Sequence, residues 1–151
     1  MGTVAGLLRI NKMQFEEVKK TKKFPSQYEF SLDVDKDWEA IMYILGDGYL
    51  GREPSVFLFT GRNMIISYQD KHMTEGVGYH SKEDIKEYNE LLKNFPLEEK
   101  MQTLDLEKMN KIIIYPIHED RLSIVKERII QITQLFHDAL KNDEIVIGSL
   151  G

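Results

Sequence analysis

Apolar residues recur at alternating spacings of three and four positions near the C-terminal end of the chain. They are Leu122, Val125, Ile129, Ile132, Phe136 and Ala139. This spacing places them on one face of an α-helix, which Ile130, Leu135 and Leu140 widen. The pattern predicts a helix over 120–141 that forms the centre of the core, with Ile129 and Ile132 fully buried.

Two shorter segments show the same helical period. In 36–45 it aligns Trp38, Ile41, Met42 and Leu45, and in 82–94 it aligns Ile85, Tyr88 and Leu92, with Phe95 following. Asp33 and Asp35 are expected to cap the first of these helices, and Gly46 to end it at the C′ position. Ser81 and Asp84 have the spacing of a capping box and are expected to begin the second.

The start of the chain predicts a strand over 3–10 followed by another helix. Asn11 and Gln14 again have the spacing of a capping box, and Phe15 and Val18 are expected to face inward. This helix ends in a basic cluster of Lys19, Lys20, Lys22 and Lys23. Cations suit the C-terminal end of a helix dipole, although an anionic partner is the alternative interpretation. Pro25 and Ser26 are expected to begin a loop.

The remaining segments are short, and one of them has two interpretations. Residues 56–59 and 64–68 read as two strands, but a helical turn over 55–60 fits nearly as well. Residues 76–79, the run IIIYP at 112–116 and 145–147 are expected to be extended. No repeat or linker divides the chain. We therefore expect one α+β domain over 1–151: a small mixed sheet covered by three to five helices, with a long C-terminal helix followed by a terminal strand.

Composition limits the classes of function. The 151 residues include 25 acidic and 20 basic side chains, and the net charge of −5 disfavours a nucleic-acid partner because such affinity comes mainly from lysine and arginine. The absence of cysteine excludes disulfides, thiolate metal sites and cysteine nucleophiles. No signal peptide or membrane span is apparent, so we expect a soluble, cytoplasmic protein with no membrane partner.

Each candidate cofactor or metal motif in the sequence lacks a feature that the corresponding site requires. GDGYLG at 46–51 matches a dinucleotide fingerprint in letters, but a helix precedes it where the motif requires a strand. His72, His80, His118 and His137 do not have metal-site spacing. Asp33, Asp35 and Asp37 alternate as in a calcium loop but lack its glycine and its final glutamate. No cofactor and no metal are expected.

Aromatic residues suggest one ligand pocket. Trp38, Tyr43, Tyr79, His80 and Tyr115 are the candidate ligand-binding residues. Aromatic rings supply apolar walls with a polar tip, the glycines at 76 and 78 permit a close backbone approach, and His80 titrates near neutral pH. The hypothesis requires at least three of the five to border one cavity. Core packing is the default interpretation of these rings, and the shared pocket is the alternative to it.

Four stretches of the chain resemble the YfbM-like family of domains of unknown function. They are MGTVAGLLRI, SLDVDKDWEAIMYILGDG, GVGYHSKEDI, and IIIYP with the helix and strand that follow it. The similarity covers 1–18, 31–48 and 76–151. Its most recognisable elements are Leu32, Asp33, Asp35, Asp37 and Trp38, and then the Tyr115–Pro116 pair. The resemblance implies an α+β fold that is more helical over 47–75 than the local propensities suggest, and it implies no reaction.

Two hypotheses for the function remain. The first is a non-catalytic binding domain that recognises a protein or peptide partner, which the absence of a nucleophile–base pair, metal cluster or phosphate loop favours. The second is a small-molecule-binding protein or an enzyme that uses an aromatic pocket near Trp38, Tyr79, His80 and Tyr115.

Overall fold

The computed structural model describes residues 4–22, 32–67 and 76–151. Several positions named above lie outside these ranges. They are the first residue of the expected N-terminal strand, Lys23, the loop at Pro25 and Ser26, Tyr68 and His72.

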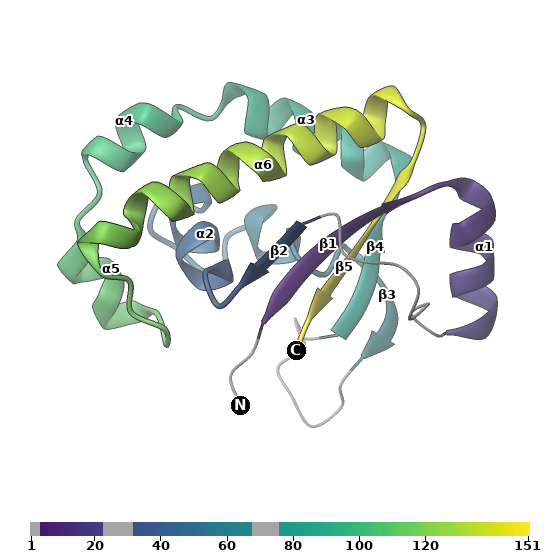
Figure 1. Ribbon diagram of the computed structural model, residues 1–151, viewed down its shortest axis with the longest axis horizontal. Helices are drawn as coiled ribbons and strands as arrows, with labels where there is room; N and C mark the ends of the chain where they lie inside the picture. Colours follow the sequence, from purple (N-terminus) through teal and green to yellow (C-terminus); the bar gives the residue numbers. More distant parts are fainter. Residues whose placement is uncertain (1–3, 23–31, 68–75) are drawn as a thin grey trace.

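Five strands form one sheet in the order β2-β1-β5-β4-β3 (Figure 1). Their bounds are Ala5–Ile10 for β1, Leu32–Asp35 for β2, Asn63–Ser67 for β3, Gly76–His80 for β4 and Ile145–Leu150 for β5. All four neighbouring pairs are antiparallel, so the sheet is not mixed as expected. The terminal strand β5 lies at its centre, between β1 and β4.

Most of the helices pack on one face of the sheet, and α1 packs on the other. Their bounds are Lys12–Thr21 for α1, Trp38–Leu45 for α2, Lys82–Asn94 for α3, Leu97–Gln102 for α4, Leu106–Ile112 for α5 and Leu122–Lys141 for α6, with 3₁₀ turns η1 at Ser55–Phe57 and η2 at Glu119–Arg121. The long helix α6 crosses one face, on the side where α2 to α5 also lie, and α1 stands apart at the other end of the sheet (Figure 1). The α+β class and the long C-terminal helix before a terminal strand are confirmed, with more helices than expected.

The apolar stripe of α6 is the centre of the main core, as predicted. Val125, Ile129, Ile132 and Phe136 are each at most 1% exposed. Partners come from α2, α3, η1 and the sheet face below, so this one stripe joins most of the domain. A smaller core on the opposite face contains Phe15 and Val18 of α1 with Leu8, Ile10, Val77 and Ile147.

Both predicted capping boxes are present. The Asn11 side chain accepts a hydrogen bond from the backbone N–H of Gln14, and the Gln14 side chain accepts one from the N–H of Asn11. Ser81 and Asp84 make the same reciprocal pair at the start of α3. These local signals identified the N-terminal ends of two helices to the residue.

Two glycines let a loop lie directly on the sheet. Gly78 of β4 and Gly148 of β5 are cross-strand partners. A Cβ at Gly148 would lie 2.0 Å from the carbonyl oxygen of Phe59, and one at Gly78 would lie 2.1 Å from that of Thr60. The approach allowed by these glycines is therefore taken up by the chain's own backbone. Of the two interpretations of this region, the helical turn is correct at η1, and β3 is the second expected strand.

The expected capping of α2 by Asp33 and Asp35 is wrong. Asp33 and Asp35 belong to strand β2 rather than to a helix cap, and the Asp33 side chain accepts from the N–H of Asp35, which has a left-handed φ of 49°. The residue at the start of α2 is Asp37, whose side chain makes no capping hydrogen bond. Its carboxylate is used in a tertiary contact instead.

Gly46 ends α2, but not in the left-handed conformation that the C′ position favours. Its φ is −86°, and positive φ values occur at Asp47 and Gly48. Glycine is required at 46 because a Cβ would lie 2.1 Å from the carbonyl oxygen of Tyr49. GDGYLG is thus a helix end and loop, as interpreted from the sequence.

The IIIYP run is not a strand. Helix α5 extends to Ile112, and the following residues form an irregular connection to η2. Ile113 and Ile117 are buried while Ile114 is 71% exposed, so the run alternates without pairing to the sheet. An apolar run with high β propensity becomes a strand only where a neighbouring strand is available.

Replacing Ile129 with Asp should unfold the domain or lower its free energy of unfolding by several kcal/mol, because an unpaired charge would enter the main core. The adjacent Ile130 is 44% exposed. Ile130→Asp is therefore the matched control, with an expected loss within about 1 kcal/mol. Urea unfolding checks both, and equal losses would show that the face of α6 is wrongly assigned.

Candidate functional site

The predicted aromatic residues lie in separate places. Trp38 and Tyr115 do meet, with ring centroids 6.5 Å apart at an interplanar angle of 71°. The Nζ of Lys36 lies 5.5 Å from the centroid of the Tyr115 ring. The Glu39 carboxylate accepts hydrogen bonds from the backbone N–H groups of Ile114 and Tyr115, at 2.8 Å and 3.2 Å. The two most recognisable sequence elements therefore form one structural unit.

Tyr79 and His80 are neighbours in β4 and so face opposite sides of the sheet. Tyr79 packs edge-on against Phe15, with centroids 4.6 Å apart, in the small core. His80 is fully buried in the main core against Tyr88 and Phe136, at 4.7 Å and 5.1 Å. The alternation of β4 therefore prevents these two side chains from lining one pocket.

The ring of His80 has a defined tautomer. Its Nε2 lies 2.8 Å from the carbonyl oxygen of Leu58, and a carbonyl can only accept, so Nε2 carries the proton. Nδ1 is buried and has no hydrogen-bond partner among the described residues. Burial lowers the pKa of His80 to about 4, against smaller raising effects of the Leu58 carbonyl and Asp84. His80 is therefore neutral and has a structural role near neutral pH.

Tyr43 lies apart from the other four. It is 5% exposed and borders a cavity at the C-terminal end of α2. The five candidates thus divide between the Trp38–Tyr115 contact, the two sides of β4 and this cavity. Of the five, Tyr43 is the one that borders the cavity at the end of α2 among the described residues, and a ligand contact of any one of them stays a prediction.

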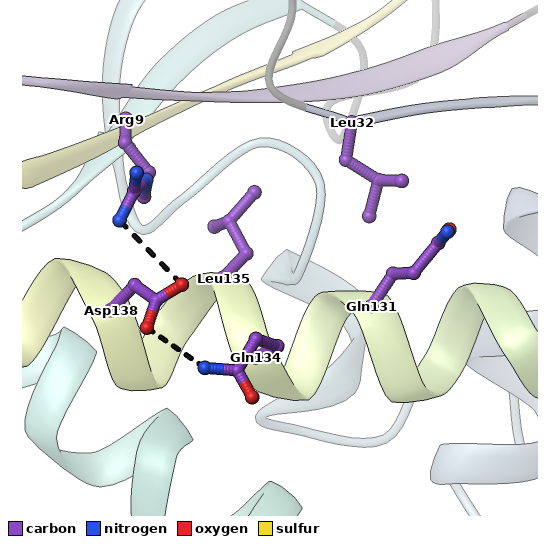
Figure 2. Close-up of a pocket in the computed structure, with 6 residues that line it drawn as sticks. All are labelled: Arg9, Leu32, Gln131, Gln134, Leu135 and Asp138. Atoms are coloured by element: carbon purple, nitrogen blue, oxygen red, sulfur yellow. Dashed lines mark hydrogen bonds and ion pairs between the residues drawn. The ribbon is translucent and has the colours of Figure 1, made fainter.

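A groove runs along α6 beside strands β1 and β2. Its first cavity, of about 270 Å³, is lined by Arg9, Leu32, Gln131, Gln134, Leu135 and Asp138. Figure 2 shows Arg9 and Leu32 pointing from the strands toward α6, which supplies the other four. The Asp138 carboxylate accepts a hydrogen bond from Nε2 of Gln134 at 2.8 Å and lies 3.8 Å from Nη1 of Arg9. Arg9 also pairs with Glu144 at 3.3 Å.

A second cavity continues the groove toward the N-terminal end of α6. It has a volume of about 390 Å³ and is lined by Asp33, Ser123, Ile124, Glu127, Arg128 and Gln131. Gln131 borders both cavities, so they adjoin. We refer to the two together as the α6 groove.

Some charged side chains of the α6 groove are paired within the chain, and others are not. Arg128 donates to the Asp37 carboxylate at 2.5 Å and to the carbonyl oxygen of Val34 at 2.7 Å. Glu127, in contrast, has no ion pair among the described residues, and the Gln131 carboxamide makes no hydrogen bond there. The groove therefore offers an uncommitted carboxylate and an uncommitted amide beside the exposed Ile124.

The sequence contained part of the signal for this site. Glu127, Gln131, Gln134 and Asp138 lie at spacings of four, three and four, so they share the polar side of the helix that the apolar stripe predicts. The strands that complete the groove come from the other end of the chain, and local patterns carry no information about that contact.

In 4–22, 32–67 and 76–151, no group of three His, Asp or Glu side chains is arranged to hold a metal ion. Over the same residues, no helix combines the length and apolarity that a membrane crossing requires.

The geometry defines an α+β domain with a C-terminal helix over an antiparallel sheet and a groove along that helix. The chain belongs to the family described as Domain of unknown function (DUF1877), which matches residues 1–148. The match includes 47–75, where the resemblance seen in the sequence was weakest. No curated protein matches the chain.

One solved structure shares this fold over nearly its entire length. It is described as the crystal structure of a protein of unknown function, YfbM, from Escherichia coli. The TM-score is 0.73 at 13% sequence identity, and the alignment covers 98% of this chain and 99% of the other. At this identity the likeness establishes the fold and the resemblance that the sequence suggested, and no activity.

The buried His80 should make the domain less stable in mild acid. Its pKa falls from 6.5 to about 4 on folding because burial disfavours the charged ring. Between those values the unfolded chain binds a proton that the native state does not, so this contribution lowers the free energy of unfolding as pH falls from 6.5, by about 3 kcal/mol at pH 4.

Urea unfolding at a series of pH values measures this effect against two variants. His80→Gln should be less stable at pH 7 but should lose less stability between pH 6.5 and 4. The exposed His137→Gln should keep the wild-type slope. Equal slopes for wild type and His80→Gln would show that the native ring is accessible to protons.

Proposed function

We propose that the domain is a non-catalytic binding module and that the α6 groove receives a protein or peptide segment. The observation that carries this proposal is the position of Gln131 between two adjoining cavities, with its carboxamide uncommitted. A carboxamide has two donors and an acceptor, so it can match the alternating N–H and C=O groups of an extended backbone.

The groove has the mixed lining that such recognition uses. Leu32 is apolar and partly buried, and Ile124 is apolar and 43% exposed, which suits an apolar side chain of the partner. Around them lie amide and charged groups that would orient a segment rather than bind it non-specifically. Interfaces combine apolar anchors with a polar rim in this way.

The charge of the groove indicates the chemistry of the partner. Both arginines, Arg9 and Arg128, are paired with carboxylates of this chain. Asp33 and Glu127 are exposed carboxylates that have no cationic partner among the described residues. The net charge of −5 acts in the same direction. A segment that presents a basic side chain next to an apolar one complements this surface.

The arrangement of the aromatic residues supports the alternative, a small-molecule site near Trp38, Tyr79, His80 and Tyr115, less well. Trp38 and Tyr115 contact each other, while Tyr79 and His80 are used in different cores. A shared cavity is the observation that this alternative requires.

A charge reversal in the groove tests the proposal. Glu127→Lys should weaken capture of the native partner about tenfold, since like charges then meet at the contact. Gln131→Ala should also weaken it. The matched control is Glu107→Lys on α5, which makes the same change in net charge at an exposed site with one weak ion pair at 3.6 Å.

The measurement is quantitative affinity purification from the native host, followed by titration of the captured protein with each variant. The proposal predicts one protein that wild type and Glu107→Lys retain and both groove variants lose, with all variants melting normally. If Glu127→Lys and Gln131→Ala both bound the partner as tightly as wild type does, the assignment of the groove would be contradicted.

A further inference from the structure

The cavity that Tyr43 borders lies between the C-terminal end of α2 and the connection from α4 to α5. Its volume is about 190 Å³. It is lined by Tyr43, Ile44, Asp47, Gly48, Lys100, Thr103, Leu104, Asp105 and Lys108. None of these residues lines the α6 groove, so the cavity is a separate site.

Tyr43 contributes a hydroxyl to this lining. The residue is 5% exposed, and its hydroxyl makes no hydrogen bond to a described residue. The hydroxyl oxygen is not among the buried polar atoms without a partner, so it reaches solvent. The hydroxyl lies beside Gly48, 3.8 Å from where a Cβ would stand, and both residues border the cavity. The phenol therefore borders the cavity next to the backbone of Gly48.

Some of the charged groups that line the cavity have hydrogen-bond partners within the chain, and one does not have an ion pair there. Lys100 donates to Asp47 at 2.9 Å, and that hydrogen bond lowers the pKa of Asp47. Asp105 accepts from the backbone N–H of Lys108 at 3.1 Å. The Lys108 ammonium has no ion pair among the described residues. One cation and one hydroxyl are thus available to a ligand.

We propose that this cavity binds a small monocarboxylate through the Tyr43 hydroxyl and the Lys108 ammonium. A carboxylate accepts strong hydrogen bonds from both kinds of donor. Asp47 and Asp105 also line the cavity and would repel a dianion such as phosphate, whereas they can accept from a hydroxyl or ammonium group next to the carboxylate. The volume limits the ligand to a few heavy atoms, below the usual range of about 300–1,000 Å³ for drug-sized ligands.

The test uses three probes and one contrast ligand. Acetate, L-lactate and L-serine are titrated into the ¹⁵N-labelled protein, with inorganic phosphate as the contrast. The proposal predicts saturable shifts of the Gly48 and Thr103 amide signals with at least one monocarboxylate, and weaker binding of phosphate. No saturable shift with any of the three probes, or tighter binding of phosphate, would overturn it.

Two variants separate this site from general ionic effects. Tyr43→Phe removes only the hydroxyl, so it should melt like wild type and bind about tenfold more weakly. Lys108→Gln should also weaken binding, whereas Lys86→Gln, which removes an exposed lysine from α3, should not. Unchanged affinity in Tyr43→Phe would overturn the proposal. The result is independent of the α6 groove, because no residue is shared.

Discussion

The carboxylate of Asp37 is buried at the start of α2, and two arginines at and beyond the start of α6 hold it there. Asp37 is 3% exposed. Arg128 reaches it at 2.5 Å and Arg121 at 3.0 Å. A buried carboxylate is costly unless it is paired, so this contact constrains how α2 and α6 can be placed. Arg128 also donates to the Val34 carbonyl, which adds the edge strand β2 to the same junction.

The α6 groove adjoins that junction. Arg128 forms part of the floor of the α6 groove, and its pairing to Asp37 leaves Glu127 and Gln131 as the groups that can meet a partner. Glu39, two residues further along α2, holds the backbone at Ile114 and Tyr115, where burial raises the pKa of the Glu39 carboxyl. Of the acidic residues that make the sequence recognisable, Asp37 is therefore explained by packing, whereas Asp33 and Asp35 are exposed.

Local patterns predicted the fold well because its helices have strong signals. The stripe of α6 and the capping boxes at Asn11 and Ser81 require only neighbouring residues. The same approach failed at 112–116, where apolar β-branched residues had no strand beside them, and at Asp33 and Asp35, whose strand β2 is fixed by pairing with β1. Strand pairing is a tertiary property, and short segments do not encode it alone.

The candidate site was harder to predict for the same reason. Tyr79 and His80 are adjacent in sequence but opposite in the sheet, and Gly78 of β4 accommodates the backbone of Thr60 rather than a ligand. Tyr43 was a candidate for its ring, while the position of its hydroxyl at the cavity beside α2 follows only from the tertiary structure. Family membership and the YfbM likeness supply the fold, so function has to be argued from these sites.

A double-mutant cycle on Asp37 and Arg128 tests most directly whether this contact positions α6. Asp37→Asn should lower the free energy of unfolding by about 3 kcal/mol, because it removes the carboxylate from both arginines. Arg128→Met should lower it by about 2 kcal/mol, because the buried Asp37 then keeps Arg121 as its remaining partner. The double variant should lose clearly less than the sum, with a coupling of about 2 kcal/mol. Additive losses below about 1 kcal/mol each would contradict the account, since the two helices would then be held by apolar packing alone.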